Sequence, residues 1–192
     1  MLQAQIEPHF LFNTLANVRR LYQTSPDDGA TMLDNLMRYL AVALPQMREA
    51  DSTLGREAAL TAAYLEIQRI RMGRRLAFDI DVAQPLRQAR IPPLMLLTLA
   101  ENAIKHGLAP LPEGGHIAIT ANTDGRELQV RVADSGRGFT QSSGGGTGLA
   151  NTRARLAAMH GAAARLTLAL NTPRGVVATI AVPLSVLAGS PG

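Results

Sequence analysis

The sequence predicts an α+β protein in which a module of helices precedes a layer of about five strands and two or three helices. Apolar residues recur at helical spacing up to about residue 72, and the pattern changes to strict alternation at Leu76. Further along, two pairs of alternating segments flank turn sequences, as expected for β-hairpins. We therefore expect a boundary near residue 74 that separates modules at 1–74 and 75–192.

The first helix is expected over residues 2–24. Leu11, Leu15, Val18 and Leu21 recur there at spacings of four, three and three residues, which places apolar side chains on one face of a helix.

Two further helices are expected in this module. The turn sequence SPDDG at residues 25–29 ends the first helix, and a second runs over about 30–44 before Pro45 weakens or ends it. Thr53 is a suitable N-cap for a third helix that reaches Met72. Two long arms joined by a short turn make a helical hairpin with one apolar face on each arm. A lone hairpin buries too little surface to be stable, so we expect two copies to pair into a four-helix bundle.

The second module alternates strands and helices. Its Pro and Gly residues supply helix starts, helix ends and hairpin turns. The expected elements, in order, are a strand at 76–82, a helix at 91–106, a hairpin of strands at 116–123 and 126–134, a helix at 149–160, and a hairpin of strands at 164–170 and 176–184.

Composition excludes several classes of protein. Of the 192 residues, 46% are hydrophobic and 18% charged, which excludes a disordered tail, collagen or a coiled-coil rod. No apolar run reaches the roughly 18 to 20 residues that cross a bilayer, and the N-terminal sequence lacks the pattern of a signal peptide. The absence of Cys excludes disulfides and thiolate zinc sites and fits a reducing cytoplasm.

The net charge of +4 comes from the second half of the chain. Residues 85–192 hold 10 Lys/Arg and 5 Asp/Glu, whereas residues 1–84 hold 9 and 10. Aromatic residues are few and no run of Lys/Arg exceeds two, so nucleic acid is a poor candidate ligand. A small anionic ligand fits better, and Lys105 is the only lysine.

Polar groups crowd the end of the helix expected at 91–106. Asn102 shares a helix face with His106 and lies three residues from Lys105. Asn offers a neutral oxygen ligand for Mg²⁺, and Lys offers a point charge for phosphate. A helix that simply reaches the surface at its end explains the segment about equally well.

Two glycine-containing segments follow. Asp134 ends a strand, and Gly136 and Gly138 after it let backbone approach a flat ligand closely, while Asp accepts hydrogen bonds from an amine. A plain turn explains this segment nearly as well. A second segment leads straight into a helix, where free N–H groups and the helix dipole favour phosphate, although a flexible linker is also Gly-rich. It contains Gly144, Gly146, Thr147, Gly148 and Leu149.

Together and in this order, the three segments resemble the asparagine box and two glycine boxes of the ATP-binding domain shared by sensor histidine kinases, gyrase-type ATPases, Hsp90 and MutL. This resemblance covers residues 91–183. The sequence QAQIEPHFLFNTL at residues 3–15 is similar to the phosphoacceptor box of the LytS/YehU-like sensor histidine kinases. Residues 53–75 and the segment IPP at 91–93 also resemble that family, so nearly the whole chain is covered.

The resemblance implies a helical dimerisation and phosphoacceptor module at 1–74 and a Bergerat-type α/β sandwich at 75–192 that binds ATP and Mg²⁺. It implies autophosphorylation of His9 and transfer of the phosphoryl group to an Asp of a response regulator. The implied roles are Mg²⁺ coordination by Asn102, phosphate contacts by Lys105 and His106, and adenine recognition by Asp134 with Gly136 and Gly138. Residues 144–148 are implied to close over the phosphates, Leu149 is a further cofactor-binding residue, and Arg153 is a weaker phosphate candidate.

His9 is the proposed acceptor, although a lone His on a helix is more often an ordinary surface or core residue. Gln5 and Asn13 lie one turn away on either side, so either amide can hold one ring nitrogen and leave the other free. Pro8 favours a helix that begins or bends at this point. The family usually has Asn or Gln in place of Glu7, and no acidic residue follows His9, which leaves the general base open; Glu101 is a candidate.

The resemblance also implies a homodimer and a membrane link through an N-terminal sensor region, so we expect a cytoplasmic fragment of a protein in the bacterial inner membrane. Two alternatives stay open: a nucleotide-binding scaffold that has lost phosphotransfer, and a protein-serine kinase of the anti-sigma-factor type.

Overall fold

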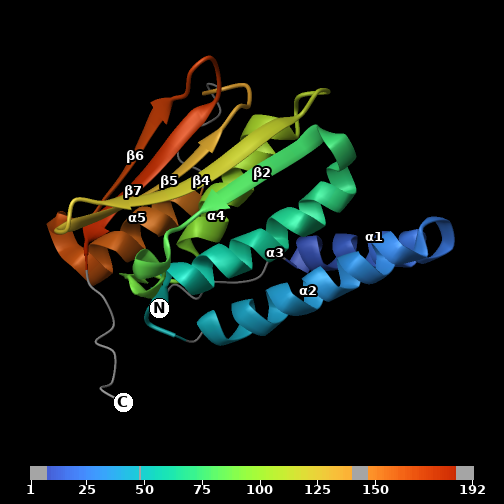
Figure 1. The fold of residues 1–192 in the computed structure, drawn as a ribbon, viewed down its shortest axis with the longest axis horizontal. Helices are drawn as coiled ribbons and strands as arrows, with labels where there is room; N and C mark the ends of the chain where they lie inside the picture. The colour runs from blue at the N-terminus through green and yellow to red at the C-terminus, as the bar shows by residue number, and fades with distance from the viewer. Residues whose placement is uncertain (1–7, 48, 140–146, 185–192) are drawn as a thin grey trace.

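The computed structural model describes residues 8–47, 49–139 and 147–184. A five-stranded sheet is covered on one face by helices, and a helical hairpin lies beyond them (Figure 1). This arrangement is the predicted α+β class, with helices first and the sheet second.

Helices α1 (Pro8–Thr24) and α2 (Pro26–Gln46) form the predicted hairpin, with Ser25 between them. The apolar row predicted for α1 is divided between two faces. Val18 faces the interior, whereas Leu15 is 49% exposed. The buried residues of α1 are Phe10, Thr14, Val18 and Leu21.

The start predicted for α2 near residue 30 was wrong. The helix begins at Pro26, because Pro suits the first helical position and the acidic Asp27 and Asp28 interact favourably with the helix dipole there. Gly29 lies inside the helix, where a Cβ would come 3.1 Å from the backbone N of Tyr22, so this glycine permits close packing of α1 on α2. At the other end, α2 stops one residue after Pro45, as the sequence indicated.

Helix α3 (Leu54–Met72) has the predicted bounds, and the Thr53 hydroxyl accepts the N–H of Arg56 as its N-cap. It packs against α2 on one side and against the sheet layer on the other (Figure 1). Its largest fully buried side chains, Leu54, Leu60, Leu65 and Ile67, belong to a hydrophobic core that continues from the hairpin to the sheet. The boundary near residue 74 stays a prediction, since the packing is continuous there.

The sheet has the order β2-β4-β5-β7-β6, with β2 parallel to β4 and every other pair antiparallel. Both predicted hairpins are confirmed. A small pair of two-residue strands was not predicted, because two residues carry no periodicity. The strands are β1 (Ser52–Thr53), β2 (Leu76–Asp81), β3 (Arg90–Ile91), β4 (Gly115–Thr123), β5 (Glu127–Asp134), β6 (Arg165–Leu170) and β7 (Val176–Pro183), with β1 paired to β3.

Helix α4 (Met95–Asn102) starts later than predicted, because Ile91 belongs to β3 and Leu94 has a positive φ of 61° that interrupts the helical path. Past Asn102 the chain continues as the π-helix η3 (Ala103–Leu108), a rare form that often occurs at functional sites. The remaining helical elements are η1 (Gly73–Arg75), η2 (Gln84–Gln88), α5 (Thr147–His160), which starts two residues before its predicted start, and η5 (Gly161–Ala163).

A buried carboxylate connects α3 to the start of α4. Glu57 has no exposed surface, and its two oxygens accept the N–H groups of Leu94 at 2.9 Å and Leu96 at 3.3 Å. These N–H groups lie at a helix N-terminus, where a negative charge is favoured. Burial raises the pKa of Glu57 to about 7, although the backbone hydrogen bonds oppose the rise.

We predict that the stability of the protein depends on the titration of Glu57. Between its ordinary pKa of 4.5 and about 7, the folded state holds a proton that the unfolded state releases, so the contribution of Glu57 to stability falls as pH rises through this window. The Glu57→Gln variant is neutral at every pH. The Gln side chain is expected to destabilise the fold by an amount that does not change with pH. Because the unaltered protein loses stability as pH rises from 4.5 to 7, the free energy of unfolding of Glu57→Gln, measured relative to that protein, should rise by up to about 3 kcal/mol over this range.

Denaturant titrations at several pH values measure this difference. Glu66→Gln, on the same helix but partly exposed, is the matched control for the loss of a carboxylate from α3. A difference between the Glu57→Gln and unaltered proteins that stays constant with pH would contradict the assignment.

Candidate functional site

Two cavities meet at Asn102. The first, of about 110 Å³, lies between α4 and the sheet. The second, of about 630 Å³, is a cleft bordered by α1, α3 and α4. Asn102 lines both cavities, so the two lie on either side of this residue.

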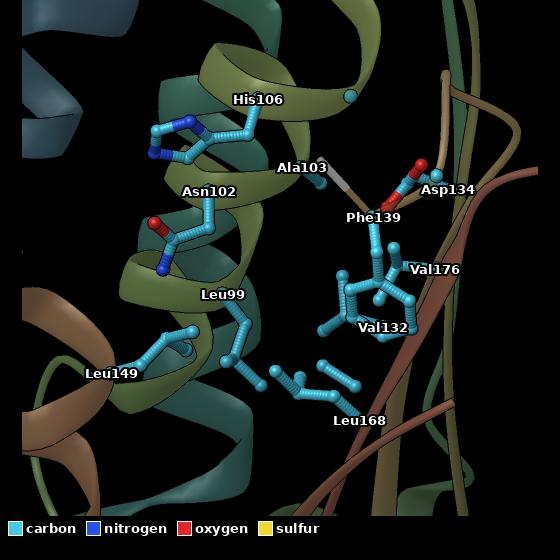
Figure 2. Close-up of a pocket in the computed structure, with 13 residues that line it drawn as sticks. Leu99, Asn102, Ala103, His106, Val132, Asp134, Phe139, Leu149, Leu168 and Val176 are labelled. Atoms are coloured by element: carbon cyan, nitrogen blue, oxygen red, sulfur yellow. The ribbon is translucent and has the colours of Figure 1, made fainter. Parts of the chain in front are cut away.

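The first cavity is mainly apolar. Side chains from α4, η3, α5 and the strands line it; in Figure 2, Asn102 and His106 extend from the helix on the side away from the sheet, and Asp134 lies on the sheet side. An apolar space with a few polar groups at its edges suits a flat ligand that carries hydrogen-bonding groups on its rim. The apolar side chains in the lining include Leu99, Val132, Phe139, Leu149, Leu168 and Val176.

Asp134 is the charged group of this cavity. It is 5% exposed at the end of β5, and its Oδ1 accepts the N–H of Gly136 at 2.8 Å. Burial raises the pKa of this carboxyl, while the N–H groups of Gly136 and Val176 oppose the rise. A carboxylate has about four lone-pair sites, so Asp134 retains capacity to accept a hydrogen bond from an amine.

Three glycines allow backbone segments to pack around Asp134. A Cβ on Gly107 would lie 2.8 Å from the Oδ1 of Asp134, and one on Gly136 would overlap the Cα of Gly107. Gly175 has φ 108°, and a Cβ on it would overlap the backbone oxygen of Asp134. Gly136 therefore acts by permitting this packing, whereas Gly138 lines the cavity itself.

The cleft brings together residues that are far apart in the sequence. Six of the residues singled out from the sequence line it, and α3 adds basic and polar side chains that sequence reasoning missed. The six are His9, Asn13, Glu101, Asn102, Lys105 and Gly148, and the additions from α3 and η1 are Tyr64, Gln68, Arg71 and Arg75.

His9 is exposed in the cleft and has the expected partner one turn away. The Nδ2 of Asn13 lies 3.0 Å from Nδ1 and 3.2 Å from Nε2 of the His9 ring. One of these nitrogens can accept a hydrogen bond from the amide, which restricts rotation of the ring. Glu7, and Gln5 as the second expected partner, lie outside the described residues.

An aromatic cluster holds this end of α1 in place. Phe10 packs edge-on against Tyr39, with ring centroids 5.2 Å apart, and against Tyr64 at 5.3 Å. Aromatic pairs of this kind add about 0.5 to 1.5 kcal/mol beyond the burial of their area. Because His9 is adjacent to Phe10, the cluster fixes the part of α1 that carries the imidazole at the cleft.

The end of α4 presents its polar residues to both cavities. Lys105 lines the cleft and His106 lines the first cavity, and both are exposed on η3. The Nδ2 of Asn102 is buried and has no hydrogen-bond partner among the described residues. A buried amide without a partner is costly, so this atom is an exception to the rule that buried polar groups are hydrogen-bonded.

The other residues predicted to contact the nucleotide lie on α5 or outside the residues that the structure describes. Gly144 and Gly146 lie outside the described residues, and Thr147 is the first residue of α5. Gly148 lines the cleft and Leu149 the first cavity. Arg153 is exposed on α5 and lines neither cavity.

Two family models match the chain. The model described as histidine kinase matches residues 1–76, and the model described as histidine kinase-, DNA gyrase B-, and HSP90-like ATPase matches residues 91–186.

Curated relatives match most of the chain. Sensor histidine kinase BtsS of Escherichia coli strain K12 is 32% identical over 158 residues, which are 81% of this chain and 28% of BtsS. Sensor histidine kinase YesM of Bacillus subtilis is 32% identical over 187 residues, 95% of this chain and 32% of YesM. Sensor protein LytS of the same organism is 28% identical over 196 residues, 95% of this chain and 33% of LytS. The chain thus spans about a third of the length of these relatives.

Solved structures share the fold. The catalytic domain of histidine kinase ThkA has a TM-score of 0.53 at 20% identity, covering 71% of this chain and 97% of that domain. Full-length ShkA in complex with AMPPNP has a TM-score of 0.54 at 21% identity, covering 88% of this chain and 40% of ShkA.

Proposed function

The chain belongs to the sensor histidine kinases of the LytS type, and on this premise we propose that it transfers the γ-phosphoryl group of ATP to its own His9. The observation that carries the proposal is the junction at Asn102. This side chain lines both the apolar cavity and the cleft that contains His9, so a nucleotide whose base occupies the cavity directs its phosphates toward the acceptor.

We assign the adenine of ATP to the first cavity, with Asp134 accepting a hydrogen bond from the exocyclic amine. The phosphates extend along Lys105 and His106. Closure of residues 144–148 over the phosphates stays a prediction from the sequence. Asn102 lines both cavities, and its neutral amide oxygen would hold Mg²⁺ beside the phosphates. Mg²⁺, when bound, neutralises phosphate charge.

The transfer uses the neutral imidazole of His9. A ring nitrogen donates its lone pair to the γ-phosphorus while the bond from that phosphorus to the β-phosphate oxygen breaks, and ADP leaves with the electron pair. The phosphorylated ring is then an imidazolium that must lose a proton. We assign this proton to Glu101, which lines the same cleft, and ring orientation to Asn13. The protein contributes mainly positioning and charge neutralisation.

In this proposal the phosphohistidine passes its phosphoryl group to an Asp of a response regulator, and two copies associate through α1 and α2. Exposed apolar side chains on these helices support the association, because such groups are stabilised when a second hairpin covers them. They are Phe12, Leu15, Tyr22, Met37 and Leu44, with exposed fractions from 49% to 72%.

The alternatives fit the observations less well. A scaffold that has lost phosphotransfer gains no support, because His9, Asn102 and Lys105 all line one cleft. The histidine kinase match over residues 1–76 disfavours a serine kinase. Among the described helices, none has the length and hydropathy to span a bilayer. The expectation of a membrane-bound parent protein stays a prediction.

His9→Gln should abolish acid-labile labelling by [γ-³²P]ATP while leaving the affinity for AMPPNP unchanged, because the imidazole accepts the phosphoryl group but does not hold the base. Asn102→Ala should abolish labelling although His9 is present. His160→Gln, at the end of α5, is the control and should label normally. Retained acid-labile phosphate in His9→Gln would reject His9 as the acceptor.

Asp134→Ala should weaken the binding of AMPPNP by roughly 10- to 100-fold, because a hydrogen bond to a charged group contributes about 1.5 to 3 kcal/mol. Calorimetry on the full chain measures this. Asp124→Ala, in the exposed turn between β4 and β5, is the matched control. An affinity equal to that of the unaltered protein would exclude Asp134 from the adenine site.

Replacing both Phe12 and Leu15 with Asp should shift the protein from dimer to monomer, because the charges would be buried between two hairpins. Light scattering coupled to size exclusion gives the mass. The Leu170→Asp variant changes a side chain that is 71% exposed on β6 and should leave the dimer intact. An unaltered protein that is monomeric at high micromolar concentration, or a dimeric double variant, would refute this interface.

A further inference from the structure

Helix α3 gives the cleft a polar row that the steps above do not use. Tyr64, Gln68 and Arg71 follow one another at spacings of four and three residues, so they share one face, and all three line the cleft with His9 and Lys105. We propose that Arg71 is a catalytic residue that binds the phosphoryl group during its passage from ATP to His9. This inference rests on the proposed function.

Buried neighbours hold Arg71 in the cleft. Its Nη1 donates to the Oε1 of Gln68 at 3.0 Å, and Gln68 is only 5% exposed. The Gln68 side chain is in turn hydrogen-bonded to the Tyr64 hydroxyl. Because Tyr64 also packs against Phe10, one chain of contacts positions both the guanidinium and the helix that carries His9.

The two neighbouring arginines have other tasks. Arg75 donates from Nη2 to the backbone oxygens of Ala109 at 3.3 Å and Leu111 at 2.7 Å, which secures the segment after η3. Arg69 forms an ion pair with Glu66 at 2.7 Å and lies over the ring of Phe78. Arg71 is instead bonded to a neutral amide, which leaves its charge uncompensated by that partner.

The chemistry of Arg suits this position. A guanidinium has five N–H donors in one plane, and the bond to Gln68 uses one of them, so a pair remains for two oxygens of a phosphoryl group. Arg71 comes from α3 and Lys105 from η3, so the cations reach the cleft from different walls. In the transition state the γ-phosphorus is leaving the β-phosphate oxygen and approaching the His9 nitrogen, and negative charge is spread over its three remaining oxygens. Arg71 neutralises that charge.

The experiment compares Arg71→Gln, Arg71→Lys and the control Arg69→Gln in the full chain. It measures the single-turnover rate of acid-labile labelling and the affinity for AMPPNP. We expect Arg71→Gln to lower the rate roughly 100-fold or more, with AMPPNP affinity within about threefold of the unaltered protein, since the contact forms in the transition state. Arg71→Lys keeps the positive charge but loses the paired donors of the guanidinium, so its labelling rate should lie between those of Arg71→Gln and the unaltered protein. The labelling rate of Arg69→Gln should be near normal.

The reverse reaction gives a second readout of the same step. His9 is phosphorylated chemically with phosphoramidate, and the rate at which ADP removes the phosphoryl group is measured. Both directions share one transition state, so Arg71→Gln should slow this rate by the same factor. A normal labelling rate, or a loss of AMPPNP affinity equal to the loss of rate, would overturn the role of Arg71 while leaving the kinase assignment intact. Absence of labelling in the unaltered protein would overturn both.

Discussion

The contact of Phe10 with Tyr64 joins α1, the helix that carries His9, to the buried helix α3. Tyr64 belongs to α3, which is buried between the hairpin and the sheet, and near the other end of the same helix Glu57 holds the start of α4. One buried helix thus positions both the helix that carries His9 and the helix that carries Asn102. Protein interiors are densely packed, so a shift of α3 would move both walls of the cleft.

The electrostatics of the cleft follow from this packing. Arg71, Arg75 and Lys105 supply three positive charges, and Glu101 supplies one carboxylate. Basic groups in a concave site concentrate an anionic ligand more than the same charges on an open surface. The first cavity differs in character, because it is apolar and contains one buried carboxylate. The contrast between the two cavities matches a molecule with a flat base at one end and phosphates at the other.

Sequence reasoning succeeded where the information was local. Long periodic segments predicted the strands and the bounds of α3, and the spacing of four residues predicted the hydrogen bond between His9 and Asn13. It failed where tertiary packing decides. The aromatic cluster joins residues from three helices, which no local pattern indicates. Gly29 lies inside α2, where glycine is usually unfavourable, because the backbone of α1 comes too close to leave room for a larger residue. The π-helix after Asn102 likewise has no periodic signal, although it directs Lys105 and His106 to different cavities.

The central claim is that His9 lies beside the phosphate end of a nucleotide bound at Asn102. Proton NMR of the histidine rings with Mn²⁺ and ADP tests it directly, because paramagnetic broadening falls steeply with distance. Mg²⁺ with ADP is the diamagnetic reference, and the His9→Gln variant identifies the His9 signals. The account predicts that the His9 and His106 resonances broaden together. A His9 signal that stays sharp while that of His106 broadens would contradict it.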